Sequence, residues 1–307
     1  MGVNCMGDLK LFSIKNGVKE LVGTSVAIEK SIQTLIENNM EAFFGITFLA
    51  SEYSTGKTHG GRIDSLGIDE NYCPVILEYK RALNENVINQ GLYYLDWLMD
   101  HKAEFKLLVM EKLGKDIADK IEWSMPRLLC VAGDFTKFDE YAVKQINRNI
   151  ELIRYKKYVD DLILFELVNV TTASQTANIS DDGITKSNVY KTVTENLQQA
   201  DEELQDMYYS VRDFILSLGD DIQEKVLKYY IAFKKIRNFA CVEIYPKNRT
   251  VLMYLNINPD EVELKEGFTR DVRNIGHYGT GNLEVRINNR DDFEKAKELI
   301  AKSYDEN

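Results

Sequence analysis

The stretch Gly60-Gly61-Arg62-Ile63-Asp64, followed shortly by Val75-Ile76-Leu77-Glu78-Tyr79-Lys80, decides the fold of the first half of this chain. Both segments have the apolar pattern of short strands, and the brief connection between them favours a hairpin. Side chains alternate between the two faces of a strand, so Glu78 and Lys80 share one face. If strand 61–67 pairs with strand 74–81, Asp64 comes to lie across from Glu78. The sequence therefore predicts two carboxyls and one amine in a common pocket at a strand end.

This combination suits the hydrolysis of phosphodiester bonds. Carboxylate oxygens and a backbone carbonyl, for which Tyr79 is the natural supplier, are the ligands that Mg²⁺ or Mn²⁺ prefers. Because two neighbouring carboxylates disfavour joint ionisation, the pair Asp64 and Glu78 itself favours a bound metal. Lys80, next to that cation, can orient or deprotonate the attacking water or stabilise charge on the phosphate.

Two helices near these strands carry candidate supporting residues. Gln90 and Tyr94 lie four residues apart in a segment of helical spacing over 84–99, so they share one face. Glu29 lies in the first turns of an earlier helix, 25–38, which Ser25 can cap. Glu37 and Glu41 compete with Glu29 for this role. Further positive charge near the strands comes from Lys57, His59, Arg62 and Arg81.

Each of these residues also has a purely structural explanation. A Glu-x-Lys pair occurs by chance as a solvated charge pair on an edge strand, and Gln90 can be a surface amide. Tyr94 can be a half-buried core aromatic, and Glu29 a favourable charge near a helix N-terminus. The joint occurrence of all the motifs is what favours the functional interpretation.

Working outward, the remaining segments predict a mixed sheet flanked by helices, an α/β arrangement. Helix 25–38 weakens at Asn38-Asn39 and is followed by a shorter segment through Phe44. The other predicted elements are a hairpin of 9–14 and 19–22 around Asn16-Gly17, strands 46–53, 61–67, 74–81, 127–132, 151–154 and 162–168, and helices 84–99, 105–113 and 138–149.

The pattern Glu29, Gly61-Arg-Ile-Asp64, Ile76-Leu-Glu78-Tyr-Lys80 and Gln90-x-x-x-Tyr94 resembles the PD-(D/E)XK nuclease superfamily. More narrowly, it is similar to the catalytic domain of NucS-like and RecB-like endonucleases. The resemblance covers 25–154 and implies a restriction-endonuclease-like core in the order αβββαβ. It implies Asp64, Glu78 and the Tyr79 carbonyl at a Mg²⁺ or Mn²⁺ ion and Lys80 as the catalytic lysine. It also implies Glu29, Gln90 and Tyr94 as supporting residues.

DNA rather than RNA as the substrate, and endonuclease rather than exonuclease action, are expected through this resemblance alone. The separate DNA-binding domain that NucS-like enzymes carry has no counterpart before the first core helix. DNA contacts are therefore expected from the nuclease domain, the C-terminal domain, a second subunit or a partner.

The composition changes over 170–187, which is small, polar and almost free of large apolar residues. We predict a nuclease-like domain at 1–170, a linker at 171–187 and a smaller α+β domain at 188–307. Its predicted elements are helices 190–217 and 221–235, strands 240–245, 251–257 and 282–287, and a terminal helix 291–304. This layout resembles uncharacterised domains fused to such nucleases, and more weakly MmcQ/YjbR-type domains. This domain is also expected to offer a surface for a homodimer or for a protein partner, and the sequence does not choose between the two.

Two features of the second domain allow alternative interpretations. The segment 268–281 is dense in Gly, Arg and aromatic residues; it is either a loop that approaches a phosphate or a partner strand, or a tight connection in which His277 is structurally hydrogen-bonded. The tight connection is the favoured explanation. A basic cluster on or just after helix 221–235 can face nucleic acid, although a solvated helix surface is the default. Its members are Lys225, Lys228, Lys234, Lys235 and Arg237.

The composition sets limits on function. A net charge of -11 argues against non-specific coating of DNA but does not exclude a local catalytic site. Cys5, Cys73, Cys130 and Cys241 are scattered, which predicts reduced thiols rather than a zinc site. The sequence shows no secretory signal or membrane span, so a cytoplasmic location is expected. The predicted function is a metal-dependent nuclease in repair, restriction or defence.

Two rival functions come from other classes. One is a non-catalytic nucleic-acid-binding or scaffolding protein built on a nuclease fold. The other is an interaction module that uses the acidic surface. The presence of all three central ionisable residues, Asp64, Glu78 and Lys80, favours the enzyme.

Overall fold

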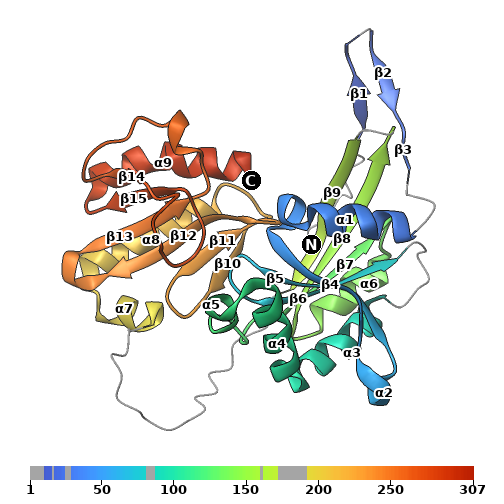
Figure 1. Ribbon diagram of the computed structural model, residues 1–307. Coiled ribbons are helices and arrows are strands. Elements are labelled where there is room, and N and C mark those ends of the chain that lie inside the picture. Colours follow the sequence, from blue (N-terminus) through green and yellow to red (C-terminus); the bar gives the residue numbers. More distant parts are fainter. Residues whose placement is uncertain (1–9, 16, 25–28, 81–86, 160–161, 172–191) are drawn as a thin grey trace. The chain divides into compact units, whose positions relative to one another are not determined.

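The computed structural model describes residues 10–15, 17–24, 29–80, 87–159, 162–171 and 192–307 (Figure 1). The chain divides into two compact units, one running to Thr176 and the other starting at Ala177, with the short stretch Glu41–Gly45 grouped with the second. The predicted linker 171–187 falls almost entirely outside the described residues. The domain boundaries 1–170 and 188–307 therefore remain a prediction.

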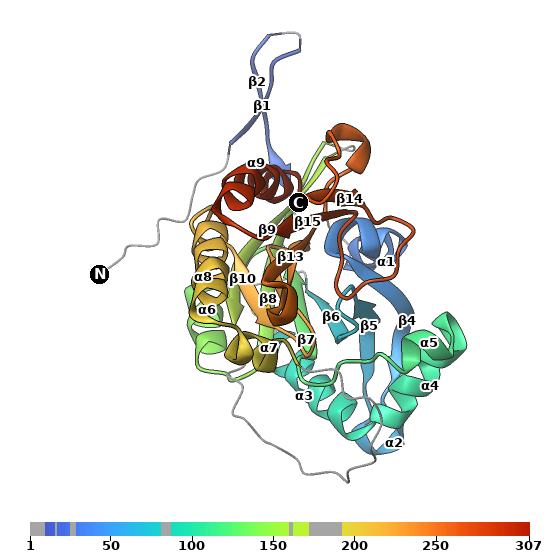
Figure 2. The same ribbon diagram turned by 90° about the vertical axis from the view of Figure 1, so that its left-hand side faces the viewer.

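The first unit is a mixed sheet flanked by helices, as the sequence predicted (Figures 1 and 2). In the described residues its main sheet has the strand order β3-β8-β7-β6-β5-β4, with β9 beside β8, and β1 and β2 form a separate hairpin. Its strands are β1 (Leu11–Ser13), β2 (Lys19–Leu21), β3 (Gly23–Thr24), β4 (Ile46–Ser54), β5 (Arg62–Asp69), β6 (Pro74–Lys80), β7 (Arg127–Ala132), β8 (Asn149–Tyr158) and β9 (Leu162–Thr171). Its helices are α1 (Glu29–Phe44), α2 (Gly56–His59), α3 (Val87–Asp100), α4 (Lys102–Leu113), α5 (Lys115–Ala118) and α6 (Lys137–Lys144).

The central strands are buried because both faces of the sheet are covered. β6, β7 and β8 run parallel to one another, and β7 is buried along its whole length, as is typical of central parallel strands. Apolar residues of α3 pack on the face that carries Ile76 and Leu128. α1 bonds to the opposite face, which carries Ser65. The element order from α1 to β8 contains the predicted series of helix, three strands, helix, strand.

Several predicted boundaries were wrong. α1 does kink where the sequence weakens, at Asn39, whose φ of -134° is not helical. However, α6 ends at Lys144 instead of reaching 149, because Asn149 already pairs with Arg127 in the sheet. β8 is longer than the predicted 151–154, and the short helices α2 and α5 were not predicted.

A buried ion cluster joins three strands at the end of the sheet where β7 begins. Arg127 donates from Nε and Nη2 to the two carboxylate oxygens of Glu151, at 2.7 and 2.9 Å. Its Nη1 donates to Oδ2 of Asp69 at 2.8 Å. All three side chains are at most 4% exposed. The cluster lies at the far end of β6 and β7 from Glu78 and Lys80, so it stabilises the sheet rather than the candidate site.

The second unit is an antiparallel sheet with its helices packed on one face (Figure 2). The strand order is β10-β11-β12-β13-β15-β14 in the described residues. The strands are β10 (Gln223–Val226), β11 (Ile231–Lys234), β12 (Asn238–Tyr245), β13 (Thr250–Leu255), β14 (Thr269–Asp271) and β15 (Leu283–Ile287). The helices are α7 (Val193–Gln199), α8 (Glu202–Leu216) and α9 (Arg290–Glu306), with short 3-10 turns at Pro246–Asn248 and Pro259–Glu261.

The prediction of one helix over 221–235 was wrong, because this segment forms the hairpin β10–β11. The spacing of Leu227, Tyr230 and Ile231 fits a helix, but Ile231 and Phe233 alternate into the core against β12. The basic cluster therefore does not form a helix surface. Lys225 and Lys234 are buried at 4% and 1% exposure. The predicted helix 190–217 is also split, since Asp201 caps a new helix at its first turn.

The Gly-rich segment 268–281 is a tight connection, in line with the favoured explanation. The two ring nitrogens of His277 lie 3.1 Å from the carbonyl oxygens of Tyr278 and Gly281. Its ring stacks on Tyr254 with 4.0 Å between centroids. Gly281 has a φ of +142°, and a Cβ there would lie 2.7 Å from the backbone of Tyr254, so glycine is required.

Among the described residues, Cys73, Cys130 and Cys241 are buried and form no disulfide, whereas Cys5 lies outside the described residues. Across the parts of the chain that the structure describes, no helix has the length and apolar character needed to cross a membrane.

Candidate active site

Asp64 and Glu78 lie side by side where the β5–β6 ladder ends. The last regular pair is Ser65 with Leu77. Beyond it, each carboxyl accepts a hydrogen bond from the backbone of the other strand. The Asp64 N–H donates to Glu78 Oε1 at 3.2 Å, and the Tyr79 N–H donates to Asp64 Oδ2 at 3.0 Å. The structure thus brings the two predicted acids together at one point of the sheet.

Both carboxyls are in an environment that resists ionisation. Glu78 is fully buried, and burial raises its pKa to about 9, with a further rise from the neighbouring Asp64. Burial also raises the pKa of Asp64, against the opposing effects of the Tyr79 N–H and the Lys80 ammonium. A second positive charge at this point would favour the ionised form of both acids.

Glu78 has one oxygen that the described residues leave unsatisfied. Oε2 is buried and has no hydrogen-bond partner among them. A buried polar atom without a partner is costly, and a proton shared with Asp64, an ordered water or a bound cation would each satisfy it. Two adjacent carboxyls with one such oxygen fit a hard divalent cation, with the Tyr79 carbonyl as a further oxygen ligand. Within the described residues, no group of three or more His, Cys, Asp and Glu side chains is arranged to hold a metal.

The buried acid predicts a test of stability without any metal. Since the folded pKa of Glu78 is raised above the unfolded value, its contribution to stability is full below pH 4.5 and is lost as pH rises toward about 9. In EDTA, the free energy of unfolding of Glu78→Gln relative to that of the wild type should therefore increase from pH 5 to pH 8, by an amount on the order of 2 kcal/mol. Urea unfolding followed by tryptophan fluorescence measures this gain, because Trp97 and Trp123 both lie in the first unit.

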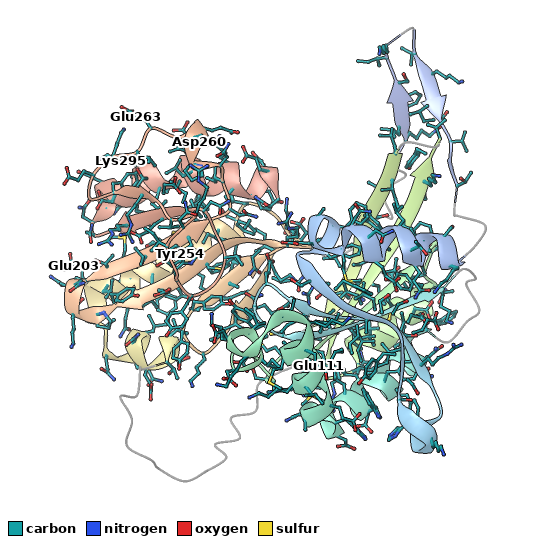
Figure 3. All side chains as sticks on the ribbon, in the orientation of Figure 1. Glu111, Glu203, Tyr254, Asp260, Glu263 and Lys295 are labelled. Carbon is teal, nitrogen blue, oxygen red and sulfur yellow. The ribbon has the colours of Figure 1, made fainter. Side chains whose placement is uncertain are left out.

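A matched control is Glu111→Gln, an exposed carboxyl on α4 that Figure 3 labels. The difference in free energy of unfolding between this variant and the wild type should stay constant over the same pH range. If the difference between Glu78→Gln and the wild type is also independent of pH, Glu78 is ionised in the folded protein.

Lys80 occupies the last position of β6, in register with Ala132 of β7. It is partly exposed, and its ammonium lowers the pKa of both Asp64 and Glu78. The amine thus acts electrostatically on both acids. The juxtaposition of two carboxyls and one ammonium that the sequence predicted is present in the structure.

α1 contributes two polar residues that the motif did not identify. Gln33 Nε2 donates to the Asp64 carbonyl at 2.9 Å and to Glu37 Oε1 at 2.9 Å. Glu37 also accepts from the Ser65 hydroxyl at 2.6 Å, which in turn accepts from the Tyr79 hydroxyl. The Gln33 bond holds the backbone at Asp64, and the other bonds link side chains of α1, β5 and β6. The signal in the sequence was their helical spacing of four residues, which places both on one face.

The choice of the acid on α1 remains open. Glu29 is the first residue of α1, but its side chain lies outside the described residues. Glu41 is exposed, whereas Glu37 is tied to Ser65 on β5. Glu37 is therefore the α1 acid with a described connection to the site strands, and the role of Glu29 stays a prediction.

Tyr94 supports the strand that carries Asp64. Its hydroxyl accepts from the Arg62 N–H at 3.2 Å and from Gln90 Nε2 at 3.4 Å. The chain passes so close to the ring that a Cβ on Gly61 would lie 2.6 Å from a Tyr94 ring carbon. Gln90 and Tyr94 thus share a face, as predicted, and brace the segment before Asp64.

The basic residues near the start of β5 differ in their contacts. Lys57 and Arg62 are exposed, and Arg62 lies 3.5 Å from Glu52. Glu52 also pairs with Lys30 of α1 at 3.2 Å, and its charge raises the pKa of Asp64. The carbonyl of His59 accepts a hydrogen bond from the Tyr93 hydroxyl. Arg81, the fourth basic residue predicted near these strands, lies outside the described residues.

These features define an α/β protein in which a buried glutamate and a partly buried aspartate lie beside a lysine. A relative from Haemophilus influenzae (strain KW20 / Rd), an uncharacterised protein, is 30% identical over 301 residues, or 95% of this chain and 98% of the relative. The chain belongs to the same family as this Haemophilus influenzae protein. Residues 193–307 match the model of a domain of unknown function, DUF5655. The likeness to MmcQ/YjbR-type domains remains a prediction.

Two solved structures are similar to parts of the chain. One is a complex of EndoMS with double-stranded DNA, at 22% identity and a TM-score of 0.28 over 43% of this chain and 47% of that one. The other is a repair endonuclease from Pyrococcus abyssi, at 17% identity and a TM-score of 0.29 over 47% of this chain and 60% of that one. The matches thus span about half the length of these solved proteins. TM-scores this low leave the site to be judged by its own geometry.

Proposed function

We propose that this protein is a metal-dependent nuclease whose site consists of Asp64, Glu78 and Lys80. The observation that supports the proposal most strongly is the acidic pair itself. One oxygen of the fully buried Glu78 lacks a partner among the described residues, and Asp64 and Lys80 act on the same carboxyl. A metal ion between the two carboxyls would satisfy this oxygen and offset the cost of burying its charge.

The residues that would hold a Mg²⁺ or Mn²⁺ ion are Asp64, Glu78 and the carbonyl of Tyr79. When bound, such an ion supplies Lewis acidity at a phosphate and lowers the pKa of water. The N–H groups of Asp64 and Tyr79 hold the two carboxyls in place for this role. Gln33 donates a hydrogen bond to the backbone carbonyl of Asp64, which helps to hold Asp64 beside Glu78.

Lys80 serves the reaction through its position beside both acids. As an ammonium it can stabilise the negative charge that develops on a phosphate, and as a neutral amine it can accept the proton of the attacking water. The exposed Arg62 and Lys57 can attract the phosphate backbone near the strand end. DNA as the substrate, and cleavage within a strand, rest on the resemblance of the motifs to NucS-like and RecB-like enzymes.

The test is cleavage of plasmid and single-stranded DNA by the full chain in Mn²⁺ and in Mg²⁺. We expect cleavage that EDTA abolishes and that Asp64→Ala lacks, since Asp64 is one of the two carboxyls proposed to hold the metal. Cleavage that persists in Asp64→Ala would indicate a contaminating nuclease and remove the support for this site. DNA binding without cleavage under every condition would instead favour the scaffolding function.

A further inference from the structure

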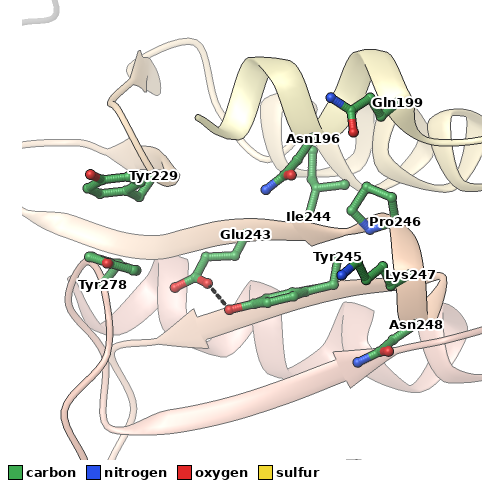
Figure 4. Close-up of a pocket in the computed structure, with 10 residues that line it drawn as sticks. All are labelled: Asn196, Gln199, Tyr229, Glu243, Ile244, Tyr245, Pro246, Lys247, Asn248 and Tyr278. Atoms are coloured by element: carbon green, nitrogen blue, oxygen red, sulfur yellow. Dashed lines mark hydrogen bonds between the residues drawn. The ribbon is translucent and has the colours of Figure 1, made fainter. Parts of the chain in front are cut away.

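A second pocket, independent of the proposed nuclease site, opens in the C-terminal unit (Figure 4). It lies at the end of β12, where the pairing with β11 stops at Val242 while β12 continues to Tyr245. Its volume is about 490 Å³, which is within the range of small-molecule sites. Two amides of α7, Asn196 and Gln199, line it together with Tyr229, Tyr278 and the strand end.

A buried carboxylate faces this pocket. Glu243 is only 4% exposed, and the Tyr245 hydroxyl donates a short hydrogen bond to its Oε2. Its Oε1 is buried without a well-formed hydrogen bond in the described part of the chain, although the Tyr278 N–H is close enough to favour the charged form. Figure 4 shows the carboxylate between Tyr278 and Tyr245.

The carboxylate has no described counter-ion. Burial raises the pKa of Glu243 to about 6, and the charged side chain that acts on it, Glu284, is acidic and adds to the rise. The group is still mostly ionised at neutral pH. A buried negative charge is ordinarily compensated by a cation, and here no ion pair among the described residues supplies one.

Aromatic rings form the wall next to this charge. The rings of Tyr229 and Tyr278 lie 4.6 Å apart at 31°. The Lys228 ammonium lies 5.0 Å from the centroid of Tyr229, so this wall already accommodates one cation of the chain itself. Tyrosine rings attract cations through their negative faces, and the attraction grows when the cation is desolvated.

We propose that this pocket binds a small organic cation, an ammonium or guanidinium group, with Glu243 as its counter-ion and Tyr278, which packs against Tyr229, as its aromatic wall. The amides of Asn196 and Gln199 line the part of the pocket next to Ile244, across β12 from the Glu243 carboxylate (Figure 4). Lys247 lines the pocket beyond the Tyr245 ring in Figure 4, so the cation is placed at the Glu243 end. This inference does not depend on the nuclease activity.

The test is isothermal titration of the full chain with choline, agmatine and 3,3-dimethylbutan-1-ol, which is a neutral isostere of choline. We expect at least one of the two cations to bind at least about tenfold more tightly than the neutral alcohol, because only a cation compensates Glu243. Two results overturn the proposal. One is an alcohol that binds as tightly as the cations, and the other is no binding of either cation up to about 10 mM.

The matched variants are Glu243→Gln and, as control, Glu263→Gln. Glu263 projects from the loop before β14, where its side chain is 85% exposed (Figure 3). Glu243→Gln should weaken cation binding at least about tenfold, and Glu263→Gln should leave it unchanged. Equal affinity of Glu243→Gln and wild type contradicts the proposal.

If circular dichroism shows that Glu243→Gln does not fold, the variant Tyr278→Leu provides the test. Tyr278 is 41% exposed, so the fold should tolerate the loss of its ring. An unchanged affinity of this variant for the cation would refute the aromatic wall.

Discussion

Lys80→Met should lower the rate of DNA cleavage by about 10²–10³-fold while divalent-cation binding is retained. The estimate follows from the loss of one positioned charge that stabilises the transition state. The Lys80 side chain is partly exposed at a strand end, so its replacement by an unbranched apolar chain should not disturb the core. Single-turnover cleavage with excess enzyme measures the chemical step directly.

The control for this variant is Lys112→Met, an exposed lysine on α4 in the same unit. It removes the same charge from the protein and should leave the rate within about twofold, since surface charges act mainly on encounter and are screened by salt. If Lys80→Met cleaves at the wild-type rate, Lys80 has no part in the reaction. If it also loses cation binding, its role is to build the metal site rather than to act on the substrate.

Arg127→Met should destabilise the first unit by about 3–5 kcal/mol, because it removes the guanidinium that compensates the charge of two buried carboxylates. Arg127 binds Glu151 through two hydrogen bonds and Asp69 through a third, and these charges are almost entirely removed from water. The cost reflects the unpaired charges that remain more than the strength of the bonds. Urea unfolding followed by tryptophan fluorescence detects it, since both tryptophans belong to this unit.

A second variant separates these two contributions. Adding Asp69→Asn and Glu151→Gln to Arg127→Met removes the charges and should restore much of the lost stability, because neutral amides are cheaper to bury than carboxylates. A loss below about 1 kcal/mol in Arg127→Met would mean that both acids take up protons or reach water when the arginine is absent.

The site strands could be predicted because their pattern is local. The alternation around Leu77 and Glu78 and the short connection to Asp64 are properties of adjacent residues, and the hairpin follows from them. The end of the regular pairing at Ser65 could not be predicted. It depends on the two carboxyls replacing the next ladder bonds, which only the folded sheet makes possible.

Other features depended on packing between distant segments. The bonds of Gln33 and Glu37 require α1 to lie in one rotation against β5, and helical spacing alone does not set that rotation. Segment 221–235 has apolar spacing compatible with a helix, yet pairing with β12 makes it a hairpin. One usable signal was overlooked: Glu243 lies among apolar residues of strand 240–245, and a charge in a buried strand indicates a compensating partner or a site.

The most direct test of the central claim is a crystal of the full chain soaked in Mn²⁺, with anomalous scattering measured to locate the metal. The proposed site predicts a Mn²⁺ peak in contact with the carboxyl oxygens of both Asp64 and Glu78, and no such peak in crystals of Asp64→Asn. A wild-type crystal in which Mn²⁺ binds elsewhere, or in which this pair stays free of metal while the solution cleaves DNA, would contradict the assignment.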